Sequence, residues 1–150
     1  QRMDGMSGLE LQAELRGLGV TLPIIFITGH GDVPMSVKAM KEGAFDFLEK
    51  PFGNERLLES IRDALLRAAR DQREHARKAA IRARYDGLTP REREVMKYVV
   101  QGMSNKHLAK QLGVSNRTIE VHRSRVMMKM GSESLPELVR MAALCGVGER

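Results

Sequence analysis

The chain has 150 residues, a formal net charge of +6 and a single cysteine. This length allows one domain or two small ones, and 42% hydrophobic with 29% charged residues is the composition of a folded soluble protein. One cysteine excludes an internal disulfide framework. No apolar run approaches the roughly 18 residues that a membrane span needs. We therefore expect a cytoplasmic protein that does not contact a membrane.

The charge is distributed unevenly along the chain. Residues 1–70 carry 9 Lys and Arg against 10 Asp and Glu, a net charge of −1, whereas residues 71–150 carry 16 against 9, a net charge of +7. The asymmetry indicates two domains, of which the basic one is a candidate for binding a polyanion such as nucleic acid. The alternative from charge alone is a solvated basic face with no partner.

Residues 1–69 alternate helix and strand signals. The apolar spacing predicts helix, strand, helix, strand and helix over 8–18, 23–28, 33–42, 44–49 and from Asn54 onward. The run Pro23–Thr28 is typical of a strand buried on both faces, and Asp32 is a suitable N-cap for the helix that follows. Strands joined by a helix pair in parallel with a right-handed crossover. The sequence therefore predicts an α/β fold for this region.

Residues 70–87 are charged and rich in alanine, without a broad apolar stripe. This composition predicts a solvated helical linker that extends the preceding helix and ends near Asp86-Gly87. The alternative is a basic arm that contacts nucleic acid.

Residues 88–150 carry only helix signals. Thr89-Pro90-Arg91-Glu92 has the pattern of a capping box with proline at the first helical position. Ser104, Ser115 and Ser134 are the expected N-caps of three further helices.

A short turn at Leu112-Gly113-Val114 separates the second and third of these helices. Ala109 provides the small side chain that closely packed helices need, and Gly113 suits a positive φ in the turn. The expected interface residues are Leu108, Leu112, Val114, Ile119 and His122. This is the arrangement of a helix-turn-helix, whose second helix enters the major groove of DNA, although other helical hairpins share it.

The surrounding stretch strongly resembles the LuxR-type DNA-binding domain. The motifs that carry the resemblance are LTPRE at 88–92, GMSNK at 102–106, LA at 108–109, VS at 114–115 and TIEVH at 118–122. The resemblance covers about residues 88–145. It implies an all-α, four-helix domain that reads DNA with its third helix and dimerises on a two-fold site. His107 departs from the pattern, because the family usually has an acidic residue there that completes a capping box.

The resemblance implies which residues bind DNA. The residues expected to contact or position the phosphates are Asn105, Lys106, Ser115, Arg117, Thr118, Arg123 and Lys129. The N–H groups and the dipole at a helix N-terminus favour a phosphate, and such contacts position a protein without specifying a sequence.

Three further residues of the third helix match the family's base-contacting positions, namely Glu120, Val121 and Ser124. A glutamate can accept a hydrogen bond from a cytosine amino group, and a valine can contact a thymine methyl group. The alternative for Glu120 is an exposed helix residue paired with Ser124 or Arg123. His122 is expected to pack at the helix interface rather than to contact a base.

Residues 3–8 and the two predicted strands resemble the later half of a response-regulator receiver domain, in particular its FixJ-like branch. The motifs are TGHGD at 28–32 and VPMSVKAMKEGAFDFLEKPF at 33–52. In that family a hydroxyl at the position of Thr28 and an ammonium at that of Lys50 contact the phosphoryl group of a phosphoaspartate, and Phe47 matches an aromatic that changes rotamer with Thr28. A phosphoaspartate carries nearly two negative charges, and this hydroxyl and ammonium can donate hydrogen bonds to its oxygens. Without the resemblance, Thr28 and Lys50 would be ordinary strand-end residues.

The resemblance also implies that the chain begins within the receiver fold, so that the earlier part of that fold precedes Gln1. The phosphorylated aspartate would lie just before Gln1, and the acidic pair that binds Mg²⁺ would lie earlier still; Asp4 stands where the family usually has proline. We therefore expect neither phosphorylation at the family site nor Mg²⁺ or another cofactor in this chain. Exposed strand faces at Ile24–Ile27 and Phe45–Leu48 should leave residues 1–69 sticky, partly unfolded or paired with another copy.

The predicted function is that of a DNA-binding transcriptional regulator in a two-component phosphorelay system, and not of an enzyme. The resemblance implies double-stranded DNA, a sensor histidine kinase acting on the full-length protein, and a second copy on DNA as partners. Two other classes stay open: a basic protein-interaction module that docks on an acidic partner, and an enzyme that uses the loop Gly29–Asp32. That loop lacks the glycine-lysine signature of a P-loop, and the 4 histidines show no metal-ligand spacing.

Overall fold

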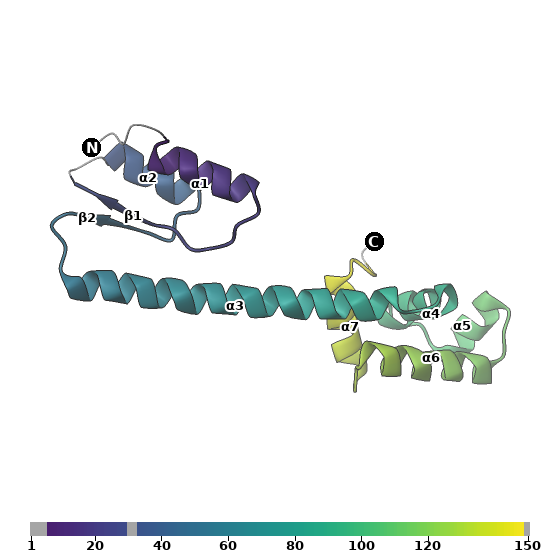
Figure 1. Cartoon of the computed structure of the whole chain (residues 1–150). Helices are drawn as coiled ribbons and strands as arrows, with labels where there is room; N and C mark the ends of the chain where they lie inside the picture. The colour runs from purple at the N-terminus through teal and green to yellow at the C-terminus, as the bar shows by residue number, and fades with distance from the viewer. Residues whose placement is uncertain (1–5, 30–32, 149–150) are drawn as a thin grey trace. The chain divides into compact units, whose positions relative to one another are not determined.

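The computed structural model of the protein describes residues 6–29 and 33–148. Within it the chain divides into two compact units, 1–73 and 74–150, each with its own arrangement of elements (Figure 1). Asp4 and the loop residues His30, Gly31 and Asp32 lie outside the described residues, so the roles predicted for Asp32 and for the Gly29–Asp32 loop stay predictions.

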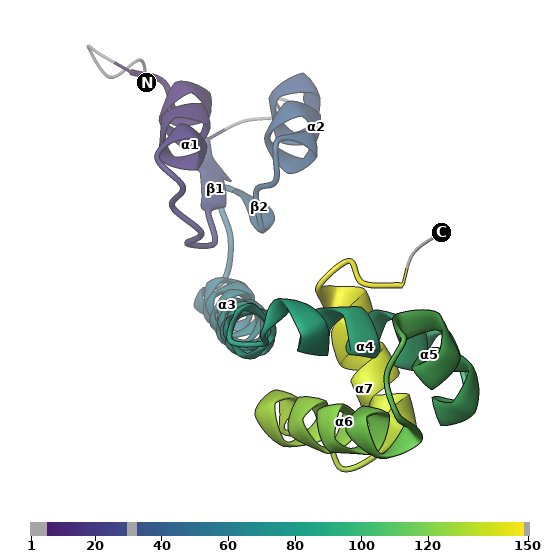
Figure 2. The same cartoon turned by 90° about the vertical axis from the view of Figure 1, so that its right-hand side faces the viewer.

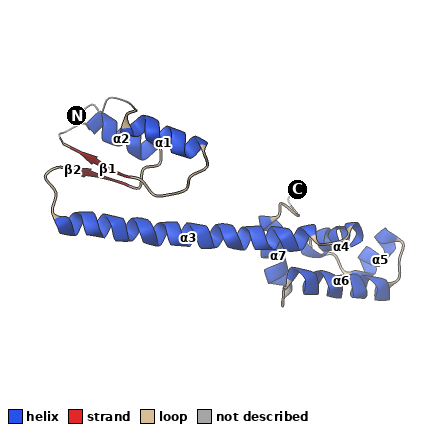
Figure 3. Ribbon diagram, viewed as in Figure 1, coloured by secondary structure: helices blue, strands red, loops and turns tan. Residues whose placement is uncertain are grey.

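The first unit is an α/β arrangement built on two parallel strands. Its elements are α1 (Gly8–Gly17), β1 (Ile25–Thr28), α2 (Val33–Lys41), β2 (Asp46–Glu49) and the beginning of α3 (Asn54–Asp86). The register places Ile25 opposite Asp46 and Thr28 opposite Glu49. Helices α1 and α2 lie on one side of the strand pair and α3 begins on the other side (Figures 1 and 3). The predicted order of elements and the parallel pairing are confirmed.

Both strands begin later than the sequence pattern predicts. Pro23 has no N–H to donate to a strand partner. The amide of Ala44 donates instead to the carbonyl of Ala39, 2.9 Å away, at the end of α2. The regular ladder therefore starts at Ile25 and Asp46.

The buried core of the first unit is small. Its described buried residues are Gln12, Ala39, Ala44, Leu48, Ser60 and Ala64. Gln12 provides hydrogen-bond donors for the end of α2, because its Nε2 donates to the carbonyls of Ala39 at 3.3 Å and Glu42 at 3.1 Å. The predicted exposure of the strand faces is confirmed at Ile27, which is 46% exposed, and is wrong at Leu48, which is 3% exposed. Side chains alternate between the two faces of a strand, so Leu48 lies on the same face of β2 as Asp46. This face is directed toward α3.

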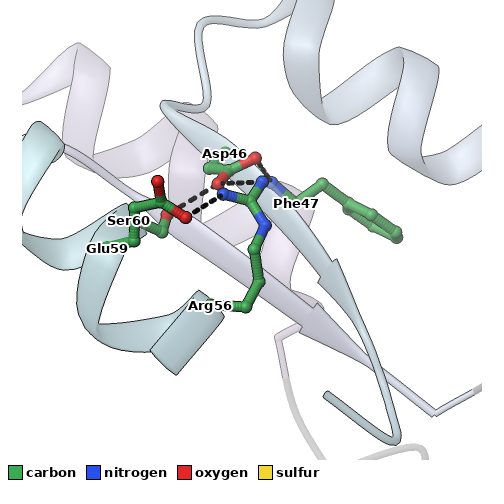
Figure 4. Close-up of polar contacts among 5 residues, drawn as sticks. All are labelled: Asp46, Phe47, Arg56, Glu59 and Ser60. Atoms are coloured by element: carbon green, nitrogen blue, oxygen red, sulfur yellow. Dashed lines mark hydrogen bonds and ion pairs between the residues drawn. The ribbon is translucent and has the colours of Figure 1, made fainter. Parts of the chain in front are cut away.

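The Asp46 carboxylate joins β2 to α3, as Figure 4 shows. Its Oδ2 accepts hydrogen bonds from Ser60 Oγ at 2.7 Å and Arg56 Nη2 at 3.0 Å, and its Oδ1 accepts one from the Phe47 amide at 2.8 Å. Burial opposes ionisation of Asp46, but the hydrogen bonds from Ser60 and Phe47 and the Arg56 guanidinium outweigh it and lower the pKa of this carboxyl. The contacts of Asp46 therefore join β2 to α3 and favour its ionised form.

The second unit contains only helices. They are the end of α3, α4 (Pro90–Val100), α5 (Asn105–Leu112), α6 (Asn116–Met130) and α7 (Leu135–Leu144). The predicted N-caps are confirmed, since the hydroxyls of Thr89, Ser104, Ser115 and Ser134 each accept the amide three residues on. Figure 2 shows α4, α5, α6 and α7 gathered around one centre.

One hydrophobic cluster occupies that centre. It consists of Ile81, Leu88, Val95, Met96, Val99, Leu108, Ala109, Ile119, Val126, Met130, Leu138, Met141 and Ala142. Leu108 and Ile119, predicted at the interface of α5 and α6, are both fully buried, with 0% exposure. Ile81 comes from α3, so the core of this unit includes one residue of the segment 70–87.

Glu92 is a buried carboxylate in the first turn of α4, with 2% of the residue exposed. Its Oε2 accepts the amide of Thr89 at 2.9 Å, which completes the predicted capping box, and the ammonium of Lys129 at 2.7 Å. The hydrogen bond from Lys129 and that from the Thr89 amide hold the pKa of Glu92 below its ordinary value despite burial. This ion pair ties the start of α4 to the last turn of α6.

Replacing Glu92 with glutamine should lower the free energy of unfolding of the second unit by about 1–3 kcal/mol near neutral pH, because the ammonium of Lys129 loses its charged partner. A carboxylate with a lowered pKa contributes stability above its unfolded-state value of about 4.3 and loses it as the pH falls through the folded-state value. The difference between E92Q and the unchanged chain should therefore shrink in acid. Urea denaturation followed by circular dichroism at about pH 7 and about pH 3 measures it.

Glu94→Gln is the matched control, because Glu94 pairs with Arg91 at 2.7 Å and its side chain is 42% exposed. An exposed pair contributes about 0–1 kcal/mol. Equal destabilisation by the two substitutions would contradict a special role for the buried pair.

Candidate nucleic-acid interface

Helices α5 and α6 meet across a tight turn. Gly113 has φ 63° and ψ 34°, the left-handed conformation that the sequence predicts for it. The amide of Val114 then donates to the carbonyl of Ala109 at 3.0 Å. The turn places the N-terminus of α6 directly after the end of α5. This is the connectivity of a helix-turn-helix.

The first turn of α6 is built on two hydroxyl groups. Ser115 Oγ accepts the amide of Thr118 at 3.0 Å and lies 2.8 Å from Thr118 Oγ1. Ser115 and Arg117 are exposed and Thr118 is half-buried. The amides and the positive end of the helix dipole at this N-terminus favour an anion such as a phosphate.

The face of α6 opposite the core carries the residues predicted to contact bases. Helical spacing places Arg117, Val121 and Ser124 opposite Ile119, and all three are exposed, Val121 by 42%. Glu120 is exposed at the edge of this face. The hydrophobic core packs against the opposite side of α6, so these exposed side chains are available to a partner.

The polar partner of Glu120 within the protein is Asn116, whose Nδ2 donates to Glu120 Oε1 at 3.3 Å. The alternative interpretation of Glu120 named Ser124 or Arg123 instead. An exposed amide–carboxylate contact of this kind is weak, and it leaves the second carboxylate oxygen available as an acceptor.

Asn105 and Arg123, both predicted at the interface, are brought together by the structure. Arg123 Nη1 donates to Asn105 Oδ1 at 2.9 Å, which joins the start of α5 to the middle of α6. Lys106 follows Asn105 and is exposed. Lys129 is placed elsewhere, since its ammonium lies on Glu92, 2.7 Å from Oε2.

The two histidines of the motif lie at different depths. His122 is half-buried on α6, as expected for an interface residue, and within the described part of the chain its buried Nδ1 has no hydrogen-bond partner. His107 is exposed, with its Nδ1 3.4 Å from Ser104 Oγ. Its ring does not return a hydrogen bond to the cap backbone, so α5 begins with an N-cap rather than a capping box.

Sequence reasoning missed two arginines. Arg125 is exposed on the outer face of α6, and its spacing of four residues from Val121 was the signal that could have identified it. Arg91 donates from Nη2 to the carbonyl of Leu112 at 2.8 Å and so supports the turn before α6. No spacing rule predicts a contact between residues this far apart in the chain.

In the first unit, Thr28 and Lys50 lie at the same end of the strand pair. Thr28 ends β1, Lys50 follows β2, and the Lys50 amide donates to the Thr28 carbonyl at 2.8 Å. Phe47 is half-buried and lies opposite Phe26 in the ladder. The described residues contain no group of three or more His, Cys, Asp or Glu that could hold a metal ion. None of the described helices is long and apolar enough to cross a membrane.

Two family models match the chain. The model for the response regulator receiver domain matches residues 1–62, and the model for bacterial regulatory proteins of the luxR family matches residues 86–142. The first match covers the strand pair with Thr28 and Lys50, and the second covers the helix-turn-helix.

Individual proteins resemble the chain over nearly its whole length. The transcriptional regulatory protein FixJ of Azorhizobium caulinodans is 50% identical over 146 residues, which are 97% of this chain and 69% of that protein. The response regulator protein TodT of Pseudomonas putida is 46% identical over 93% of this chain and 62% of its own length. The solved structure of the response regulator StyR superposes with a TM-score of 0.83 at 40% identity, covering 95% of this chain and 72% of that chain.

The chain thus spans about two thirds of the length of these relatives. Both resemblances expected from the sequence are confirmed, and with them the fold class of a receiver-type α/β unit followed by a helical LuxR-type unit. The chain belongs to the FixJ-like family of two-component response regulators, which carry a LuxR-type helix-turn-helix for transcription regulation.

Proposed function

We propose that this chain binds double-stranded DNA through α6, as the sequence-recognising part of a transcriptional response regulator. The exposed outer face of α6, opposite a fully buried Ile119, carries the proposal. A helix packed on the core by one side and exposed on the other fits the major groove, which is wide enough to admit a helix. DNA as the ligand implies a cytoplasmic location.

The phosphate contacts are proposed for the residues around the turn. Lys106, Ser115, Arg117 and Thr118 lie at the N-terminal ends of α5 and α6, where cations and amides can bind phosphate oxygens. Asn105 and Arg123 form a bridge between the two helices, and the guanidinium keeps further donors for a phosphate. Lys129 supports α6 through Glu92, and its predicted contact with a phosphate stays a prediction.

Base recognition is proposed for Glu120, Val121 and Ser124. Their side chains can offer a carboxylate acceptor, a methyl contact and a hydroxyl, respectively, to base edges. Arg125 extends the same exposed face by one turn and is a further candidate for a contact with DNA.

Control by phosphorylation is proposed for the whole protein. Thr28 and Lys50 lie at one end of the strand pair, where a hydroxyl and an ammonium can bind a phosphoryl group supplied through a sensor histidine kinase, with Phe47 as the associated aromatic. The described residues form no cluster suited to Mg²⁺, so we assign no metal to them. A second copy of the protein on a two-fold DNA site is the proposed assembly.

The other two classes have less support. FixJ is named a transcriptional regulatory protein, which favours DNA over an acidic protein as the partner of the basic half and favours a regulator over an enzyme. A protein-interaction module would bind duplex DNA without sequence preference, and this difference separates the two proposals.

Replacing Lys106 with alanine should weaken binding to every duplex and reduce the slope of log K against log salt concentration by about 0.9, because one phosphate contact is lost. The probes are a duplex selected by the unchanged chain from a random-sequence pool and an unrelated duplex of equal length. Fluorescence anisotropy across a KCl series gives both slopes.

Lys97→Ala is the control, because Lys97 is an exposed lysine in the last turn of α4 and carries the same charge. An unchanged slope for Lys106→Ala, or the same change for both variants, would contradict a phosphate contact at Lys106.

Replacing Val121 with alanine should alter sequence preference while leaving binding to the unrelated duplex within about twofold. The loss of a methyl contact or a hydrogen bond to one base pair corresponds to about 1–3 kcal/mol of discrimination, so Glu120→Ala should likewise change the preferred base at one position. Selection from the random pool, repeated with each variant, identifies that position.

Both substituted residues are exposed, so the fold should be retained, and circular dichroism checks this. Recovery of the same preferred sequence by both variants would rule against base recognition by these residues.

A further inference from the structure

The last two turns of α3 are built into the second unit. Ile81 is 4% exposed and belongs to its core. The guanidinium groups of Arg82 and Arg93 lie over the ring of Tyr85, at 5.6 Å and 5.2 Å from its centroid. Ile81, Arg82 and Tyr85 precede position 86, where the match to the luxR family model begins.

Arg84 connects this end of α3 to the recognition helix. Its Nη1 donates to the carbonyl of Met130 at 3.0 Å, and Met130 is the last residue of α6. The last carbonyls of a helix lack partners within the helix and carry the negative end of its dipole. The Arg84 guanidinium therefore gives the Met130 carbonyl a hydrogen-bond partner. Its positive charge also interacts favourably with the negative end of the helix dipole.

Gly131 leaves the space that Arg84 occupies. A Cβ atom on Gly131 would lie 2.9 Å from Arg84 Nη1, and the residue has φ +64°. Both the backbone conformation and the closeness of the arginine thus suit glycine at the end of α6.

Lys129 and Met130 place two anchors on the same turn of α6. Lys129 binds Glu92 of α4, and the carbonyl of Met130 binds Arg84 of α3. Ser115 lies at the other end of the helix, about 20 Å away for a helix of this length. The last turn of α6 is therefore fixed from two helices, at the end of the helix away from Ser115 and Arg117.

We propose that Arg84 is a positioning residue for DNA recognition, which holds the recognition helix through its last carbonyl rather than by touching DNA. The inference rests on the proposed function of α6. It extends the functional DNA-binding unit upstream of the helix-turn-helix, to the end of the helix that follows the receiver-type unit.

The test uses Arg84→Ala and Arg84→Lys in the whole chain, with the same selected and unrelated duplexes. Arg84→Ala should weaken binding to the selected duplex by about two- to thirtyfold, the range of substitutions that act through a coupled element. Binding to the unrelated duplex should stay within about twofold, and the salt slope should not change, because no phosphate contact is lost. Arg84→Lys should restore most of the binding, since an ammonium can still donate to the Met130 carbonyl.

Arg82→Ala is the matched control. Arg82 lies on the same helix end and carries the same charge, but it donates to the carbonyl of Cys145 after α7, at 3.4 Å. It should leave binding to the selected duplex unchanged.

Four results would overturn the inference: normal binding of the selected duplex by Arg84→Ala; a salt slope reduced by about 0.9 in Arg84→Ala, which indicates a phosphate contact; an equal loss in Arg82→Ala; or a folded Arg84→Lys that binds the selected duplex weakly. Where Arg84→Ala fails to fold, binding by Arg84→Lys decides alone. Selection of no duplex by the unchanged chain contradicts the proposed function itself, whereas normal binding by Arg84→Ala contradicts only the role of Arg84.

Discussion

The ion pair between the buried Glu92 and Lys129 joins the first turn of α4 to the last turn of α6, and so fixes the end of the helix proposed to recognise DNA. The same carboxylate oxygen caps α4 through the Thr89 amide. A buried carboxylate without a partner is unfavourable, and Lys129 supplies that partner from α6. The pair fixes the last turn of α6, at the end of the helix away from most of the residues proposed for DNA.

The two units differ in how their elements are stabilised. The second has a continuous cluster from Ile81 to Ala142. The first buries mainly small residues and relies on polar contacts, with Gln12 completing the end of α2 and Asp46 linking β2 to α3. Several of its large apolar residues are exposed, such as Leu22 at 73% and Leu66 at 68%. The proposed recognition of DNA therefore depends on the second unit, whereas the proposed regulation concerns the whole protein.

Local signals in the sequence predicted the helices of the second unit well. Capping residues and helix-ending glycines act over three or four positions, so the roles of Thr89, Ser115 and Gly113 follow from the sequence alone. The strands begin two residues later than predicted. The Ala44 amide donates to a carbonyl of α2 instead of to a strand partner, and local sequence patterns do not show such a contact.

Local spacing and long-range contacts contribute differently to the candidate site. Periodicity places Val121 and Ser124 on the exposed face of α6, but it cannot show that Lys129 binds a residue 37 positions earlier in the chain. The contact of Arg84 with Met130 spans 46 positions and has no local signature either. The structure therefore adds long-range contacts that support α6 to the residues predicted from local spacing, and the contacts of these residues with DNA stay predictions.

The central claim is that DNA binds the outer face and first turns of α6. An NMR titration of the isotope-labelled chain with its selected duplex tests it most directly, by mapping the amide signals that shift. We expect the largest shifts in the first turns of α5 and between Ser115 and Arg125 of α6. Largest shifts in α7 or in the first unit, with α6 unaffected, would contradict the claim.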